Sequence, residues 1–179
     1  MKDDKIVQAV KRWLDAFVVG MNLCPFAKRE LAQNRVRFAV TRVKTVEHLL
    51  LALQVECQRL NQNPSIETTI LIHPNVLSDF YDYNQFLGYA DLLLEQMGLE
   101  GVYQIASFHP DYQFAGTEAE NYSNRSPYPL LHLLREDSVA KAIDGYPDVD
   151  QIPIRNMQLM NQLGVDELKR LLRVCVDSE

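Results

Sequence analysis

The run TTILIHP, residues 68–74, places the strongest constraint on how this 179-residue chain can fold. A short, continuous apolar run of this kind is typical of a central strand that is buried on both faces of a sheet. VRFAVTRV, residues 36–43, alternates apolar and polar residues and predicts a half-buried strand before it. VYQIASFHP, residues 102–110, predicts a third strand after it.

Two helices are predicted between these strands. Apolar residues recur at helical spacing over residues 46–60 and 80–97, and Thr45 and either Ser78 or Asp79 are suitable N-caps. Connections of this length are typical of crossovers between parallel strands. We expect an α/β fold, in which a layered sheet of at least three mainly parallel strands is flanked by helices. A ferredoxin-like α+β sheet is the alternative, because the first strand could instead pair antiparallel.

The other segments are predicted to be helical. An amphipathic helix opens the chain, and a second short helix is expected from Pro25 to about Gln33, since proline is well tolerated at the first helical position. Residues 129–143 are interpreted as one or two helices. The C-terminal part, residues 152–176, is interpreted as two more helices separated by Gly164.

The composition argues against several classes of protein. A net charge of −6 disfavours a nucleic-acid binder or an anionic-membrane binder. The three cysteines form no CxxC pair, which favours a reducing compartment. No signal-peptide core is present, and the most apolar early run, residues 16–27, is too short to span a bilayer. We expect residues 1–179 to form a single cytoplasmic domain with no membrane or nucleic-acid partner, and the oligomeric state stays open.

Two of the predicted strands end in a histidine followed by a proline. His73 and His109 stand at the carboxyl ends of their strands, which is the usual ligand-binding edge of open α/β sheets. Asp111, two residues after His109, is a candidate acid, base or ligand orienter. The alternative is that each histidine satisfies a hydrogen bond at a strand end, where the proline stops the strand.

His132 and Glu136 form a second candidate pair. Their spacing of four residues puts them on one face of the predicted helix, where they could chelate a metal or where the carboxylate could orient the imidazole. Together with His73 and His109, they are the candidate ligands of zinc or iron. Such pairs also arise by chance on solvated helix faces.

Cys24 is a candidate nucleophile. It precedes Pro25, the expected first helical residue, so its sulfur is predicted to lie near the helix N-cap. Free backbone N–H groups and the helix dipole favour a thiolate there. The alternative is a small buried residue, since free cysteines are commonly buried.

The segment NYSNRSPYP is a candidate anion-binding turn. Asn124, Arg125 and Ser126 precede a proline that stiffens the chain, and Arg135 and Arg155 could extend the pocket. In the alternative interpretation, Arg125 packs on a tyrosine and pairs with a nearby glutamate, Glu118 or Glu120.

Four segments carry a resemblance to a known family. GMNLCPFA, the HPDY stretch, NRSPYPLLHLLRE and IPIRN are similar to the bacterial family labelled domain of unknown function 1415. The resemblance runs from Trp13 to about Asn156. It implies a single domain of this length, and it implies no activity, substrate or cofactor.

The residues favour a small-molecule enzyme whose site lies at the carboxyl ends of the strands. Its metal version uses the histidines with Cys24 or a carboxylate, and its thiol version uses Cys24 with a histidine such as His109 as base. The alternative is a non-catalytic module that binds an anionic ligand or partner segment through Arg125. The chain has no Walker A, GxGxxG, HExxH or GxSxG motif, which disfavours the corresponding enzyme classes.

Overall fold

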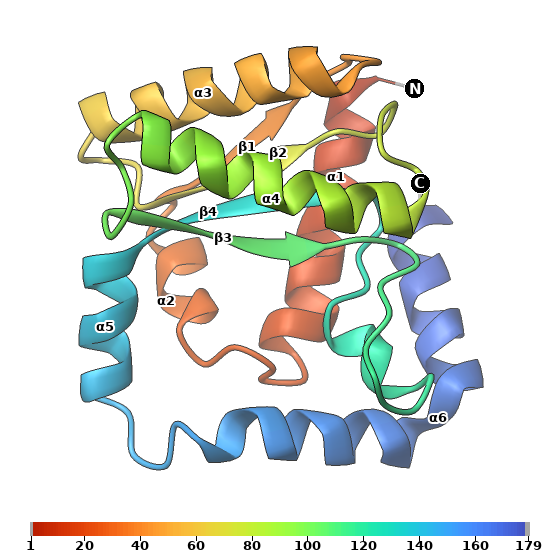
Figure 1. The fold of residues 1–179 in the computed structure, drawn as a ribbon. Helices are drawn as coiled ribbons and strands as arrows, with labels where there is room; N and C mark the ends of the chain where they lie inside the picture. Colours follow the sequence, from red (N-terminus) through yellow and green to blue (C-terminus); the bar gives the residue numbers. More distant parts are fainter. Residues whose placement is uncertain (1, 178–179) are drawn as a thin grey trace.

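The computed structural model describes residues 2–177, whose centre is a mixed four-stranded sheet (Figure 1). Its strands are β1 (Val36–Val40), β2 (Thr68–Ile72), β3 (Tyr103–Phe108) and β4 (Leu130–Arg135). They lie in the order β1-β2-β4-β3. β1 and β2 are parallel, whereas β4 is antiparallel to both of its neighbours. β1, β2 and β3 therefore share one direction, and β4 opposes them.

The sheet confirms the predicted α/β class and corrects its detail. The strands are not mainly parallel, because β4 lies between β2 and β3 in the opposite direction. The helical prediction for residues 129–143 is wrong in its first half, since a helix begins only at Glu136. β4 is buried between two other strands, so its sequence is a continuous apolar run. Periodicity alone cannot distinguish such a run from a buried helix. The reason for the ferredoxin-like alternative also fails, because β1 pairs parallel with β2.

One face of the sheet is covered by α3 (Val46–Gln62) and α4 (Phe80–Gln96), which lie side by side (Figure 1). Thr45 and Asp79 cap these helices as predicted, and each side chain accepts a hydrogen bond from the backbone N–H three residues on. A buried apolar cluster fills the space between the helices and the sheet. It includes Leu49, Leu53, Leu60, Leu71, Phe86, Leu131 and Leu133.

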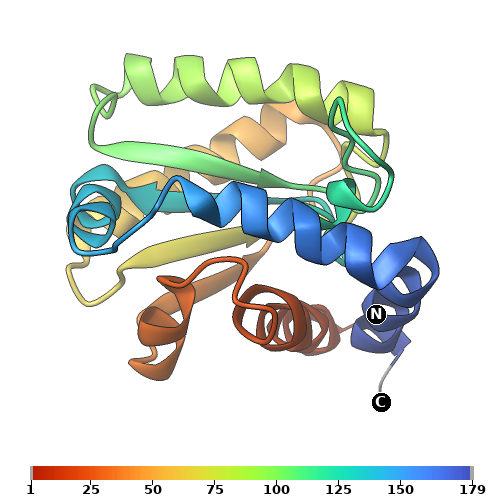
Figure 2. The ribbon, with the colours of Figure 1, turned by 90° about the horizontal axis from the view of Figure 1, so that it is seen from below.

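The N-terminal and C-terminal helices cover the other face (Figure 2). They are α1 (Asp3–Trp13), its π-helical continuation η1 (Leu14–Val19), α2 (Ala27–Ala32) and α6 (Gln151–Asp177). Their shared core includes Ile6, Val10, Trp13, Phe17, Ile72, Leu130, Met160 and Leu168. Two short elements complete the fold, the 3₁₀-helix η2 (Glu120–Ser123) and the helix α5 (Glu136–Asp144).

α6 is interrupted at Gly164, as predicted. This residue has φ 76° and ψ 161°, which is not a helical conformation, so residues 151–163 and 165–177 form two helical halves. Only glycine adopts this backbone region readily, because a Cβ would be strained there. None of the helices within residues 2–177 is long and apolar enough to cross a membrane.

Substitution of Gly164 with alanine is expected to lower the free energy of unfolding by about 1–3 kcal/mol, because a side chain is strained at this φ and ψ. Gly88 in α4 is the matched control. A Cβ built there meets no atom within 4 Å, so Gly88→Ala should stabilise the protein by roughly 0.5–1 kcal/mol through helix propensity. Urea unfolding of both variants measures the two effects, and equal effects would contradict the assigned break.

Candidate functional site

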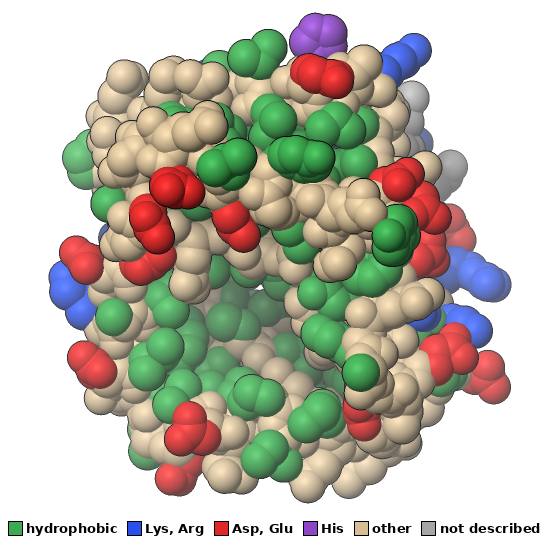
Figure 3. All heavy atoms as spheres, viewed as in Figure 1, with side chains coloured by type: hydrophobic (Ala, Val, Ile, Leu, Met, Phe, Trp, Pro, Cys, Tyr) green, Lys and Arg blue, Asp and Glu red, His purple; other side chains and the backbone are tan. Residues whose placement is uncertain are grey.

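The sheet face that packs against α1, α2 and α6 is incompletely covered. Leu131 and Leu133, which point to the opposite face, are buried, whereas Ala106, His132 and Leu134 on this face are only half-buried. Figure 3 shows a hollow between β3, α5 and α6, with hydrophobic side chains on its walls. The molecule therefore has space beside this face that its own side chains do not fill.

A cavity of about 350 Å³ lies between the end of β3 and the first half of α6. Most of its wall is apolar, and its few polar groups come from loops, from η2 and from α6. The lining residues are Val18, Leu23, Cys24, Phe108, Phe114, Glu120, Ser123, Asn124, Pro153, Asn156 and Met157. A concave, mainly apolar site with a few polar groups is the usual form of a small-molecule site.

The first wall of the cavity is the loop that follows η1. The π-helical turn brings the backbone N–H groups of Leu23 and Cys24 to the carbonyl of Val18, at 2.9 and 3.4 Å. Gly20 makes this turn possible, because a Cβ built there would lie 2.5 Å from the carbonyl oxygen of Ala16. The loop therefore folds back against the end of η1 and places Cys24 in the cavity wall.

The second wall is the first half of α6, which is tied to that loop by two side chains. Arg155 donates through Nη2 to the carbonyl of Asn22, and Asn156 donates through Nδ2 to the carbonyl of Leu23 at 2.8 Å. The Oδ1 atom of Asn156 is buried and has no hydrogen-bond partner. The IPIRN and GMNLCP segments, distant in sequence, thus meet at one side of the cavity.

The third wall is the connection between β3 and β4. Asn124 donates through Nδ2 to the carbonyl of Ser107 at 3.0 Å, and the backbone N–H of Phe114 donates to Oδ1 of Asn121 at 2.7 Å. Glu120 accepts from the side-chain amide of Asn161 in α6 at 2.7 Å. These bonds hold a long irregular loop in one conformation against α6.

Cys24 lies at the cavity but not at a helix N-cap. α2 begins at Ala27 with Phe26 at its N-cap, so the prediction that the helix starts at Pro25 is wrong, and Cys24 precedes the N-cap by two residues. Its carbonyl accepts a hydrogen bond from the N–H of Ala27 at 3.3 Å. Cys24 is half-buried, whereas Cys57 and Cys175 are buried. Burial raises the pKa of the Cys57 thiol to about 12 and also raises the pKa of Cys175. Cys24 is thus the most accessible of the three thiols.

His73 and His109 stand directly after β2 and β3, as predicted, but β4 separates these two strands, and Tyr83 of α4 packs against both imidazoles. The Tyr83 ring is 5.9 Å from the His73 ring and 5.0 Å from the His109 ring, centroid to centroid. Both histidines are fully buried. They share one edge of the sheet, yet neither of them lines the cavity.

Both imidazoles anchor the loop of residues 73–79. His73 donates through Nδ1 to the carbonyl of Val76, and His109 donates through Nε2 to the carbonyl of Leu77, both at 3.1 Å. The Nδ1 atom of His109 accepts from the backbone N–H of Asp111 at 3.0 Å. These bonds agree with the structural interpretation of the two histidines. The Nε2 atom of His73 has no partner.

His132 and Glu136 do not share a helix face, so that prediction is wrong. His132 lies in β4, opposite Ile70 of β2 and Ala106 of β3, whereas Glu136 is the first residue of α5. The Nε2 atom of His132 is 2.6 Å from the hydroxyl of Thr68. Within residues 2–177, no group of three or more histidine, cysteine, aspartate or glutamate side chains is arranged to hold a metal ion.

The candidate anion-binding residues are mainly bonded within the protein. Arg125 donates through Nε to the carbonyl of Tyr112 at 3.3 Å, stacks over the Tyr122 ring at 4.5 Å and approaches Glu118 at 4.0 Å. This matches the alternative in which it packs on a tyrosine and pairs with a glutamate. Ser126 is fully buried and donates to a backbone carbonyl two residues on.

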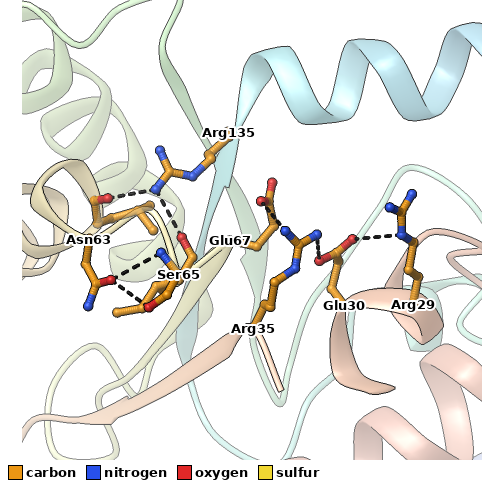
Figure 4. A network of polar contacts seen from close by, with 9 residues as sticks. Arg29, Glu30, Arg35, Asn63, Ser65, Glu67 and Arg135 are labelled. Atoms are coloured by element: carbon orange, nitrogen blue, oxygen red, sulfur yellow. Dashed lines mark hydrogen bonds and ion pairs between the residues drawn. The ribbon is translucent and has the colours of Figure 1, made fainter. Parts of the chain in front are cut away.

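Arg135 connects β4 to the end of α3 and the loop that follows. Its Nη2 atom donates to the carbonyls of Leu60 and Ile66, at 2.7 and 3.0 Å. Figure 4 shows Arg135 turned toward the loop that holds Asn63 and Ser65. Arg135 is not among the residues that line the cavity. Its contacts are those of a residue that closes a helix terminus.

The structure therefore brings together some of the predicted site residues and separates others. Cys24 and Asn124 line the cavity, with Arg155 beside it, whereas His73, His109, His132, Arg135 and Glu136 do not line it. The sequence interpretation missed Phe108, Phe114, Asn156 and Met157 as lining residues. The IPIRN segment contains Asn156 and directly precedes Met157. It was the one sequence feature that could have indicated these two lining residues.

The chain matches one known family. Residues 5–170 correspond to the family described as Protein of unknown function (DUF1415). The chain belongs to this family. The resemblance of its four motif segments is thereby confirmed, and in the structure GMNLCPFA, the loop between HPDY and NRSPYP, and IPIRN all contribute to the cavity wall. No curated protein and no solved structure matches the chain.

Lowering the pH is expected to destabilise the protein through its buried histidines. Burial lowers the pKa of His73 to about 4 from the ordinary 6.5, so the unfolded chain binds a proton first as the pH falls. Above about pH 6.5 His73 leaves the free energy of unfolding unchanged. Between about pH 6.5 and pH 4 that free energy falls by roughly 1 kcal/mol per pH unit. Urea unfolding at several pH values should show a shallower slope for His73→Gln than for wild type. An unchanged slope would contradict the assignment.

Arg135→Gln is expected to lower the free energy of unfolding by about 2 kcal/mol, because the carbonyls of Leu60 and Ile66 lose charge-assisted hydrogen bonds. Arg170→Gln is the control. Arg170 pairs with Glu167 at the exposed surface, and its loss should leave stability unchanged. Thermal unfolding of both variants measures the difference. If Arg135→Gln did not change stability, the structural role of Arg135 would be contradicted and a binding role would be favoured.

Proposed function

We propose that this protein is a small-molecule enzyme with a thiol-dependent site in the cavity beside the carboxyl end of β3. The observation that carries this proposal is the meeting of three motif-bearing segments around one cavity, with Cys24 in its wall. Loops that a rigid sheet positions are the usual place for binding and catalytic groups. In this proposal the ligand lies between β3 and α6, and the Cys24 thiol adds across an electrophilic double bond of the ligand, so that an S–C bond and a C–H bond form while the S–H bond and the π bond break.

The surroundings of Cys24 support a reactive role more than a packing role. A structural cysteine is usually buried, as Cys57 and Cys175 are, whereas Cys24 is half-buried and borders open space. All three cysteines are free, which supports our proposal that the protein works in a reducing, cytoplasmic environment.

The roles that this proposal gives to other residues are limited to what they contact. Asn156 and Arg155 hold the Cys24 loop against α6, and Asn124 holds the β3–β4 connection. The metal-dependent version and the anion-binding alternative remain predictions.

Alkylation tests the thiol-dependent site. N-phenylmaleimide is expected to modify Cys24 about tenfold faster than it modifies N-acetylcysteine, because an apolar cavity concentrates an apolar reagent beside the sulfur. The rate should saturate with reagent concentration. Mass spectrometry of digested protein identifies the modified residue, and Cys24→Ser is the control that removes the fast phase. A rate no greater than that of the free thiol would overturn the proposal.

A further inference from the structure

We infer that the cavity takes a compact, uncharged and largely apolar molecule and discriminates against anions. This inference rests on the proposed function, because it describes the ligand of the same cavity. Four observations carry it, namely the size of the cavity, its apolar walls, the bonding of its polar side chains and the charges around it.

The size of the cavity restricts the ligand to a small molecule. A volume of about 350 Å³ lies near the lower end of the range of about 300–1,000 Å³ that small-molecule sites span. Apolar side chains from three separate elements line it, including Val18 of η1, Phe108 of β3 and Met157 of α6. A ligand that fills this space buries mainly carbon surface, which is the favourable contribution to its binding.

Two aromatic rings in the wall favour a flat apolar ligand. Phe108 is held edge-on by the buried Trp13, with ring centroids 5.2 Å apart. Phe114 packs against Tyr112 at 4.7 Å and is 45% exposed. One ring is therefore fixed in the core and the other lies at the surface, and both present apolar area to the cavity.

The polar side chains of the wall are bonded to the protein, except at the buried Oδ1 atom of Asn156, which is an acceptor and offers nothing to an anion. Glu120 accepts from the backbone N–H of Thr117 and from the side-chain amide of Asn161. Ser123 donates through its hydroxyl to the carbonyl of Glu120. The donor groups of Asn124 and Asn156 are likewise engaged by backbone carbonyls. Few donors therefore remain for the oxygens of a carboxylate or phosphate.

The charge around the cavity also disfavours an anion. Among the described residues that line it there is no lysine, arginine or histidine, and the one charged side chain is the carboxylate of Glu120. The nearby arginines turn elsewhere, Arg125 toward Tyr112 and Tyr122, and Arg155 toward Asn22. An anion placed in this cavity loses its hydration and gains no cation, which is a large free-energy cost.

Two fluorescent probes that differ by one sulfonate group test this inference. The wild-type protein is expected to bind N-phenylnaphthylamine at least about tenfold more tightly than anilinonaphthalenesulfonate, because only the second carries a charge. Equal binding of the two probes, tighter binding of the sulfonate, or no binding of the neutral probe would each overturn the inference.

Variants of Met157 show whether the preference comes from the charge of the cavity. Met157 is 40% exposed in the wall, so a longer polar side chain is accommodated there. Met157→Arg should raise the affinity for anilinonaphthalenesulfonate about tenfold, whereas Met157→Gln, which adds polarity without charge, should not. An unchanged affinity in Met157→Arg would also overturn the inference, because the sulfonate would then bind elsewhere.

The same samples distinguish this inference from the proposed function. Bound N-phenylnaphthylamine should slow the modification of Cys24 by iodoacetamide, because both occupy the cavity. Protection by the sulfonate instead of the neutral probe would retain the site and overturn only the ligand class. Binding of the neutral probe together with an ordinary Cys24 reaction rate would retain the ligand class and overturn the thiol-dependent function.

Discussion

The hydroxyl group of Tyr83 makes the contact on which the arrangement of this edge of the sheet depends. It donates to the carbonyl of Leu130 at 2.7 Å and accepts from the N–H of Phe108 at 3.0 Å. One buried side chain of α4 therefore connects the first residue of β4 to the last residue of β3. Buried backbone groups are costly when unpaired, so this bridge stabilises the point where an antiparallel strand enters between two others.

The two strand-end histidines do not form a site together, because β4 separates β2 from β3. Tyr83 packs against both imidazoles, which turn to the loop of residues 73–79. Leu77 in that loop has a positive φ of 58°, which is uncommon for a residue with a branched side chain. The histidines hold this conformation, and the cavity lined by Cys24 lies on the other face of the sheet.

The parts of the fold that local patterns determine were predictable from the sequence. The caps Thr45 and Asp79, the break at Gly164 and the first three strands depend on residues close to one another in the chain. β4 was not predictable in this way. Its partners, β2 and β3, lie far from it in sequence, and its apolar run fits a strand and a helix equally well.

The candidate site was predictable only in part for the same reason. Cys24 and Asn124 were identified by residue type, but the cavity arises because IPIRN meets the Cys24 loop across more than 130 residues. The roles of the arginines were also only partly predictable from the sequence. Residue type indicates that Arg125 and Arg135 can bind anions, but only the fold reveals that their partners are backbone carbonyls and aromatic rings.

The break in α6 divides the helix into two units with different attachments. The second half packs into the core beside α1, where Arg12 donates to the carbonyl of Cys175 at 2.9 Å. The first half buries Met160 in the same core and is held to the Cys24 loop by the side chains of Arg155 and Asn156. Helical segments open locally at a lower free energy than the global unfolding of a protein. The hydrogen-exchange rates of the backbone amides of residues 151–163 thus report how often this wall of the cavity opens.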